Sequence, residues 1–167
     1  MPSGYRLELP WPVSSNRYWR TYMPKGFAAP VTALSDEAKA YKREVAWIAK
    51  RAGVKPIVGY VLLRIFLTPQ CPVDAADRAT KSPNLWALSV QSLDLGNCEK
   101  VLSDALNGIA WEDDRQIERI ELERTEPGVK GCVVEIEPYM PRWLRQKALF
   151  DRPVVTCERD GLGVLGA

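Results

Sequence analysis

One acidic stretch decides the fold, and it reads Leu93-Asp94-Leu95-Gly96-Asn97-Cys98-Glu99-Lys100-Val101-Leu102-Ser103-Asp104-Ala105-Leu106-Asn107-Gly108-Ile109-Ala110-Trp111-Glu112-Asp113-Asp114-Arg115-Gln116-Ile117. Its first half has apolar residues at helical spacing, which predicts a helix over residues 94–106. Asn107-Gly108 then supplies the residue types that commonly end a helix. Asp113 and Asp114 follow this glycine turn and lead directly into a strand predicted over residues 116–124.

Upstream of this stretch, the pattern predicts two strands and one helix. Residues 5–9 alternate apolar and polar side chains and stop at Pro10, which indicates a short strand. Ser35 is a good N-cap for a helix that ends near Gly53. Residues 59–68 form an apolar run of residue types that favour strands, and Pro69 ends it, which predicts a strand. The residues from Ser14 to Phe27 are interpreted as an ordered loop.

Downstream, a turn at residues 126–128 and an alternating strand over residues 132–136 predict a β-hairpin with the strand at 116–124. Residues 69–91 show no period and are interpreted as a mobile loop or a functional insertion. The coarse order is β-α-β-α-β-β, which predicts one mixed α/β domain with two main helices over residues 1–140. A basic-aromatic extension and a flexible tail from Asp160 follow in residues 141–167.

The composition excludes several kinds of chemistry. The chain of 167 residues has no histidine, which removes Ser-His-Asp and Cys-His catalysis and histidine-bound zinc. Hydrolysis would have to use carboxylates, lysine, tyrosine or a metal-bound water. The four cysteines stand singly and are interpreted as reduced, and no apolar run could span a bilayer. We therefore expect a cytoplasmic protein.

Charge is distributed unevenly along the chain. Residues 1–91 hold 13 Lys and Arg against 6 Asp and Glu, whereas residues 92–137 hold 5 against 12. A basic half beside an acidic segment suits a protein that holds a polyanion and concentrates carboxylates for a divalent metal. A chance distribution of solvated charge explains the same numbers equally well.

The acidic stretch also holds the candidate catalytic residues. A carboxylate where a helix begins (Asp94) and another where a strand begins (Asp114) can converge on one metal ion, and Lys100 could neutralise a phosphate. Each residue has a structural alternative, since Asp94 could cap the helix, Lys100 could pair with Asp104, and Asp113-Asp114 could be turn residues.

At these residues the sequence resembles RusA-type Holliday junction resolvases. The resemblance rests on Asp94-Leu95-x-Asn97-x-x-Lys100, on Asp104-Ala105-Leu106 and on Asp113-Asp114-x-Gln116-Ile117. Leu9-Pro10-Trp11-Pro12, followed by Ser15-Asn16-Arg17-Tyr18-Trp19-Arg20, is similar to the opening motif of that family. The resemblance runs in order from about residue 5 to residue 137.

This resemblance implies a homodimeric crossover junction endodeoxyribonuclease of DNA recombination and repair. It implies that four-way junction DNA is nicked in pairs by hydrolysis with Mg²⁺, with Mn²⁺ as a substitute. Asp94 and Asp114 match the metal-binding aspartates, with Asp113 as a further candidate ligand, and Lys100 matches a lysine needed for cleavage. We expect Asn16, Arg17, Arg20 and Lys100 to contact DNA, and the aromatic rings of Trp11, Tyr18 and Trp19 to be candidates for stacking on bases.

Gly96 departs from the family pattern, because the family usually has a second aspartate there. A neighbouring carboxylate such as Asp113, Glu99 or Asp104 could replace the missing ligand, or the site could cleave slowly. A third possibility is a protein of the same fold that binds junctions without cutting them. A structural or regulatory dimer without a nucleic-acid role is the remaining alternative.

Overall fold

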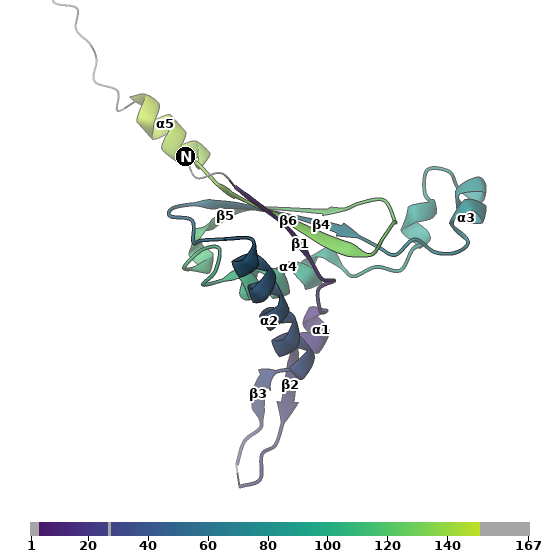
Figure 1. Ribbon diagram of the computed structural model, residues 1–167, viewed down its shortest axis with the longest axis horizontal. Coiled ribbons are helices and arrows are strands. Elements are labelled where there is room, and N and C mark those ends of the chain that lie inside the picture. The colour runs from purple at the N-terminus through teal and green to yellow at the C-terminus, as the bar shows by residue number, and fades with distance from the viewer. Residues whose placement is uncertain (1–3, 27, 151–167) are drawn as a thin grey trace, which may run out of the picture.

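A four-stranded mixed sheet forms the centre of the computed structural model, which describes residues 4–26 and 28–150 (Figure 1). Its strands are β1 (Tyr5–Leu9), β4 (Val61–Thr68), β5 (Ile117–Arg124) and β6 (Gly131–Pro138), in the spatial order β1-β6-β4-β5. Strand β5 runs parallel to β4, whereas the pairs β1–β6 and β4–β6 are antiparallel. The chain is a single mixed α/β domain, as its sequence predicts.

Strand β4 lies inside the sheet because it is the most apolar strand. Val61, Leu63, Ile65 and Leu67 alternate along it and are fully buried, whereas Arg64 between them points to the opposite face. Most residues of β5 are exposed or only partly buried, which is consistent with its position at the edge of the sheet.

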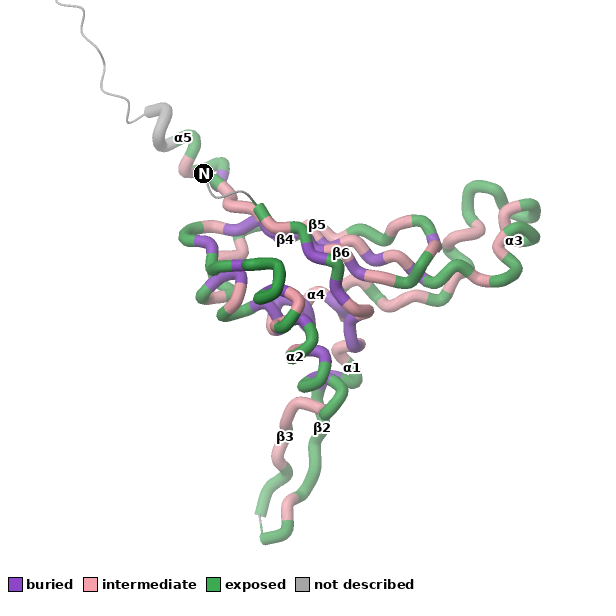
Figure 2. Tube along the Cα trace, in the orientation of Figure 1, coloured by how far each residue is buried: buried purple, intermediate pink, exposed green. Residues whose placement is uncertain are grey.

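Two helices cover one face of the sheet, α2 (Asp36–Arg51) and α4 (Leu95–Leu106), and they also pack against each other (Figures 1 and 2). The hydroxyl oxygen of Ser35 accepts a 3.1 Å hydrogen bond from the backbone N–H of Ala38, which confirms the predicted N-cap of α2. Gly53 ends this helix with a φ of 72°, a backbone conformation that favours glycine. Both predicted helices are therefore confirmed.

The segment interpreted as a loop after Ser14 is more regular than its sequence pattern indicates. It contains the short helix α1 (Ser15–Tyr18) and the strand β2 (Trp19–Tyr22), which pairs antiparallel with β3 (Val31–Leu34). This β2–β3 hairpin extends away from the sheet and helices (Figure 1). Its strands were missed because neither shows the apolar alternation of a half-buried strand.

Residues 69–91 form an arm rather than a loop without structure. It holds α3 (Ala75–Lys81) and the 3₁₀ helix η1 (Trp86–Ser89), and it projects from one end of the sheet (Figure 1). Arg78 ties the two together, since its guanidinium donates to the Asp74 carboxylate at 2.9 Å and to the Ser89 carbonyl at 3.0 Å.

The predicted hairpin between the strands at 116–124 and 132–136 is wrong. Strands β5 and β6 both form, but β4 lies between them. The connection crosses the end of β4 and is held there by backbone hydrogen bonds from Thr125 N–H to the Leu67 carbonyl and from Gly128 N–H to the Pro69 carbonyl, both 2.9 Å. The turn at 126–128 is therefore real, but it joins strands that are not neighbours.

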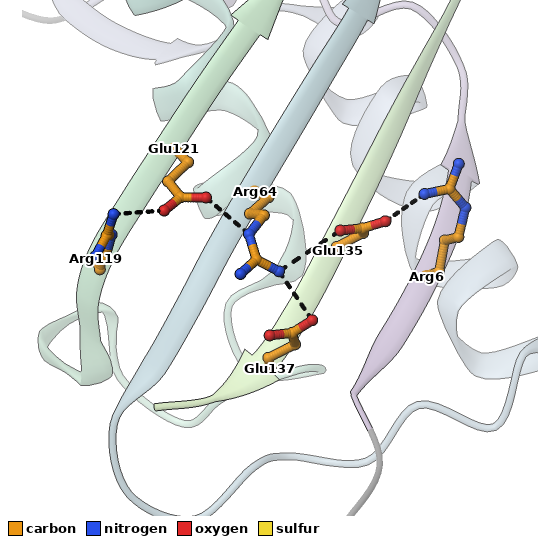
Figure 3. Close-up of polar contacts among 6 residues, drawn as sticks. All are labelled: Arg6, Arg64, Arg119, Glu121, Glu135 and Glu137. Carbon is orange, nitrogen blue, oxygen red and sulfur yellow. Dashed lines mark hydrogen bonds and ion pairs between the residues drawn. The ribbon is translucent and has the colours of Figure 1, made fainter. Parts of the chain in front are cut away.

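The opposite face of the sheet carries ion pairs (Figure 3). Arg64 donates to Glu121 at 2.7 Å and to Glu137 at 2.9 Å, and it also lies 3.7 Å from Glu135. Glu135 pairs with Arg6, and Glu121 pairs with Arg119. On β1, β4 and β6 these charges alternate with buried apolar residues, so the two faces of the sheet differ in polarity.

The extension after residue 140 begins with helix α5 (Arg142–Phe150), where the Trp143 ring lies edge-on to Tyr60 at 5.9 Å. The flexible tail predicted from Asp160 lies outside the described residues, and the division at residue 140 stays a prediction. In the part of the chain that the structure describes, no helix has the length and apolar character needed to cross a membrane.

Candidate active site

Asp94 occupies the N-cap position of α4, but its side chain does not cap the helix. Its backbone is extended (φ −65°, ψ 132°), and its carbonyl accepts from the Asn97 N–H at 3.1 Å. The carboxylate is exposed and makes no hydrogen bond to the described residues. The Asp94 carboxylate thus lies at the positive end of the helix dipole without accepting from the backbone N–H groups there, so it is free to bind a ligand.

Lys100 and Asp104 form an ion pair one helical turn apart on α4. The Lys100 Nζ lies 3.2 Å from the Asp104 Oδ1, and the Asp104 side chain is only 18% exposed. This pairing raises the pKa of Lys100, and the negative charges of Asp114 and Glu99 raise it further. Lys100 is therefore protonated and lies beside carboxylates. The i,i+4 ion pair of Lys100 with Asp104, which was the structural alternative for Lys100, is confirmed.

The Asp114 carboxylate accepts a hydrogen bond from a buried tryptophan. The Trp111 Nε1–H donates to the Asp114 Oδ1 at 3.1 Å, and Trp111 is fully buried. Asp114 itself is the exposed first residue of the 3₁₀ helix η2 (Asp114–Gln116). One carboxylate oxygen is thus fixed by the protein core while the group still faces solvent.

Gln116 fixes the turn that presents Asp114. Its side-chain oxygen accepts from the backbone N–H groups of Glu112 at 2.7 Å and Asp113 at 3.1 Å. Its amide nitrogen donates to the carbonyls of Ile57 and Gly59, both at 2.8 Å. All four interactions are to backbone groups, so this one side chain ties η2 to the connection between α2 and β4.

Asp113 is engaged elsewhere, although it was a candidate metal ligand. Its carboxylate caps η2 and forms a two-pronged ion pair with Arg115, with distances of 3.0 Å to Nε and 2.9 Å to Nη2. The guanidinium lowers the pKa of Asp113 to about 2. Its oxygens therefore already have partners, unlike those of Asp94.

Asp94 and Asp114 come from different elements, since Asp94 lies at the start of α4 and Asp114 at the start of η2, just before β5. Arg124 at the end of β5 donates to the Leu93 carbonyl at the start of α4 at 2.9 Å, which shows that α4 and β5 run in opposite directions. The negative charge of Asp114 acts on Lys100, so Asp114 lies near the Lys100–Asp104 pair. That Asp94 and Asp114 share one metal ion stays a prediction.

The described residues hold no ready-made cluster of three metal ligands. Among residues 4–26 and 28–146, no three Asp, Glu, Cys or His side chains come together as potential metal ligands. Magnesium in enzymes commonly takes one or two carboxylates together with substrate phosphates and water. The exposed carboxylates of Asp94 and Asp114 fit that donor preference, with further ligands supplied by phosphate and water.

Residues 10–137 match the family described as endodeoxyribonuclease RusA. This match covers more than half of the chain and includes the N-terminal motif from Pro10 onward, α4 and η2. The chain belongs to the RusA endodeoxyribonuclease family. No match to a curated protein was found. Membership assigns the chain to a family of Holliday junction endonucleases, and it confirms the resemblance that the motifs indicated.

The structure brings the two RusA motifs together, which their separation in sequence did not reveal. The Ser15 hydroxyl donates to the Asn97 Oδ1 at 2.6 Å, so α1 is attached to the first turn of α4. Tyr18, 1% exposed, packs farther along the same helix. Burial, and then the nearby charge of Asp104, raise the pKa of Tyr18 to about 12. Tyr18 is therefore a core residue beside Asp104, and its ring is too buried to stack on a base.

The other residues of the N-terminal RusA motif lie on the surface. Asn16, Arg17 and Arg20 are exposed. Arg17 lies 3.4 Å from Glu37, and Arg20 lies 3.3 Å from Asp36, at the start of α2. Trp11 is partly buried, with the Lys130 ammonium 5.0 Å from its ring centroid. Among the three predicted stacking rings, only Trp19 is half-exposed.

Proposed function

We propose that this chain resolves four-way DNA junctions by paired phosphodiester hydrolysis in DNA recombination and repair. The family match over residues 10–137 is the observation that supports this function. The exposed carboxylates of Asp94 and Asp114 and the protonated Lys100 supply the residue types that metal-dependent phosphodiester hydrolysis needs.

The proposed cofactor is Mg²⁺, with Mn²⁺ as an alternative, held by Asp94 and Asp114. When bound, such a cation supplies Lewis acidity and lowers the pKa of a bound water. Trp111 orients the Asp114 carboxylate. Lys100 places its ammonium against the negative charge of the scissile phosphate. Water adds to phosphorus, the bond to the 3′ oxygen breaks, and the leaving 3′ oxygen takes a proton, which yields ligatable ends.

We infer that the protein acts as a homodimer in which each protomer supplies one site built on Asp94 and Asp114. The support is the match to the RusA family over residues 10–137. A two-fold dimer repeats every contact, so two such sites would form together. Two sites are what symmetric cleavage of a four-way junction requires.

A nicking assay tests the proposed function. Purified protein is incubated with a labelled mobile four-way junction in Mg²⁺, in Mn²⁺ and in EDTA. We expect paired symmetric nicks with either cation, none in EDTA, and none from Asp114→Asn. Glu118→Gln, an exposed acidic residue of β5 without a hydrogen-bond partner among the described residues, is the control and should cleave normally.

A junction-binding protein that does not cleave is the second candidate function. It is favoured by Gly96, which lacks the carboxylate that the family usually has at that position. Tight junction binding without nicks in either cation would assign this function. Absence of junction binding at low salt would contradict both candidates.

A further inference from the structure

The β2–β3 hairpin projects from the body of the described chain (Figure 1). It extends away from the sheet and from both main helices (Figures 1 and 2), and all four residues of β2 are exposed. Its two strands are joined by the antiparallel pairing of Trp19–Tyr22 with Val31–Leu34 and by a 2.9 Å hydrogen bond between the hydroxyls of Thr21 and Thr32. A two-stranded hairpin without a packed face is only marginally stable in water. The exposed side chains of this hairpin do not contribute to the core, which leaves them available to a partner.

The hairpin combines exposed aromatic surface with positive charge. Trp19 is 50% exposed, Tyr22 45% and Met23 59%. From Arg17 to Ser35 the sequence has three basic residues, Arg17, Arg20 and Lys25, and no Asp or Glu. Large exposed apolar groups that cluster in this way indicate a binding surface. Cations beside free aromatic rings are suited to nucleic acid, in which phosphates alternate with stackable bases.

The acidic residues closest to the hairpin lie at its base rather than along it. Asp36 and Glu37, in the first turn of α2, lie 3.3 Å from Arg20 and 3.4 Å from Arg17, respectively. These ion pairs are largely exposed, so they contribute little and a phosphate can replace them. The Arg20 guanidinium also lies 5.3 Å from the Tyr22 ring centroid, which leaves charge and ring side by side on one face of the hairpin.

The base of the hairpin adjoins the candidate active site. The Trp19 ring meets the Tyr18 ring edge-on at 5.3 Å. Tyr18 is buried next to Asp104, which holds Lys100. A DNA strand that reaches Lys100 therefore passes close to the root of the hairpin, and its neighbouring bases face an exposed indole.

We propose that the β2–β3 hairpin reads the branch point of the junction, with the Trp19 ring stacked on a base at the point of strand exchange. Arg20 and Lys25 contact the phosphates on either side. Bases at a branch point have lost a stacking neighbour, so an indole binds there more favourably than inside a continuous duplex. This inference rests on the proposed junction-binding function and adds to it the element that distinguishes a junction from linear DNA.

Self-association is the competing explanation for an exposed apolar hairpin. A contact of two hairpins about a two-fold axis would bring Arg20 and Lys25 of both copies together without an intervening carboxylate on either hairpin. Like charges placed opposite each other are unfavourable. The charge of the hairpin therefore favours a polyanion as its partner.

Binding measurements with matched variants test the proposal. Dissociation constants are measured in EDTA for a four-way junction and for a linear duplex of the same sequence. The variants are Trp19→Ala, Tyr22→Ala and Trp19→Phe. Trp47→Ala is the control, because Trp47 on α2 is 59% exposed and has the Arg51 guanidinium 5.1 Å from its ring centroid. The control thus removes a tryptophan that is about as exposed as Trp19 but lies outside the hairpin.

We expect Trp19→Ala to weaken junction binding about 5- to 100-fold, the usual effect of removing one stacking ring. Tyr22→Ala should weaken it in the same direction, Trp19→Phe should recover most of the loss, and linear-duplex binding should change less than about twofold. Unchanged junction binding by Trp19→Ala, with a wild type that binds junctions, would overturn the hairpin proposal alone. An equal loss for Trp47→Ala, or dissociation of a dimer in light scattering by Trp19→Ala, would also overturn it. A wild-type protein that binds no junction would refute the proposed function as well.

Discussion

At the scale of single residues, the site depends on how each carboxylate is held. Asp113 forms an ion pair with Arg115, and Asp104 forms one with Lys100. Asp114 accepts from the buried indole of Trp111, whereas Asp94 has no partner among the described residues. Adjacent aspartates such as 113 and 114 thus have different roles, because one caps a turn and the other faces solvent on a fixed support. Residue type alone does not distinguish them.

Trp111→Phe should weaken cation binding without unfolding the protein. The change keeps an aromatic ring in the core but removes the N–H that donates to the Asp114 Oδ1 at 3.1 Å. Loss of a partner that orients a ligand typically lowers metal affinity or activity about 10- to 100-fold. The half-saturating Mg²⁺ concentration for junction nicking is the measurement, with thermal unfolding followed in parallel. A normal Mg²⁺ requirement in the folded variant would show that the indole does not orient the ligand.

Gly96→Asp should improve both the helix and the metal site. No atom lies within 4 Å of a Cβ placed at residue 96, so the new side chain meets open space. An acidic side chain in the first turn favours the helix dipole and replaces a poor helix former, which together should add about 0.5–1 kcal/mol to the free energy of unfolding. We also expect tighter Mn²⁺ binding by the free protein. Gly96→Asn is the control, since it changes helix propensity without adding charge.

At the scale of elements, the central strand β4 is the support on which the site rests. Its buried residues contact both α2 and α4 through the shared core, and Gln116 ties η2 to the segment that leads into it. The edge strand β5 and the hairpin β2–β3 have far less burial, so substitutions there should affect binding more than folding.

Leu63→Ala should destabilise the fold by about 2–5 kcal/mol, because it empties space in a closed core. Leu63 is fully buried in β4, and it pairs in register with Ile120 of β5, which is 41% exposed. Ile120→Ala is therefore a matched control from the neighbouring strand and should cost clearly less. Urea unfolding measures both free energies. Equal losses would mean that β5 is covered in solution, for example by a second protomer.

At the scale of the whole molecule, a two-fold dimer with one complete site in each protomer predicts no complementation between inactive variants. Asp94→Asn and Asp114→Asn should each be inactive alone, and a co-refolded equal mixture should stay inactive, because no protomer then has both aspartates. Junction nicking by the co-refolded mixture is the measurement. Recovery of about a quarter of wild-type nicking, with one strand of each junction cut, would show instead that each site combines aspartates of both protomers.

The sequence by itself determined the local elements. Periodicity and caps fixed the two main helices and the sheet strands, because a helix or strand is specified by side chains a few residues apart. It also identified the family, since the motifs around Asp94, Lys100 and Asp114 are read in order along the chain. The hairpin β2–β3 was not predictable, because its exposed strands lack the alternation that burial imposes.

Only the tertiary structure decided which elements are neighbours. Strand β6 pairs with β4 and β1 instead of β5 because the apolar β4 gains most from burial between two partners. The contact of Ser15 with Asn97 joins motifs that are 82 residues apart. Such distances depend on how the core packs, and no local pattern encodes them.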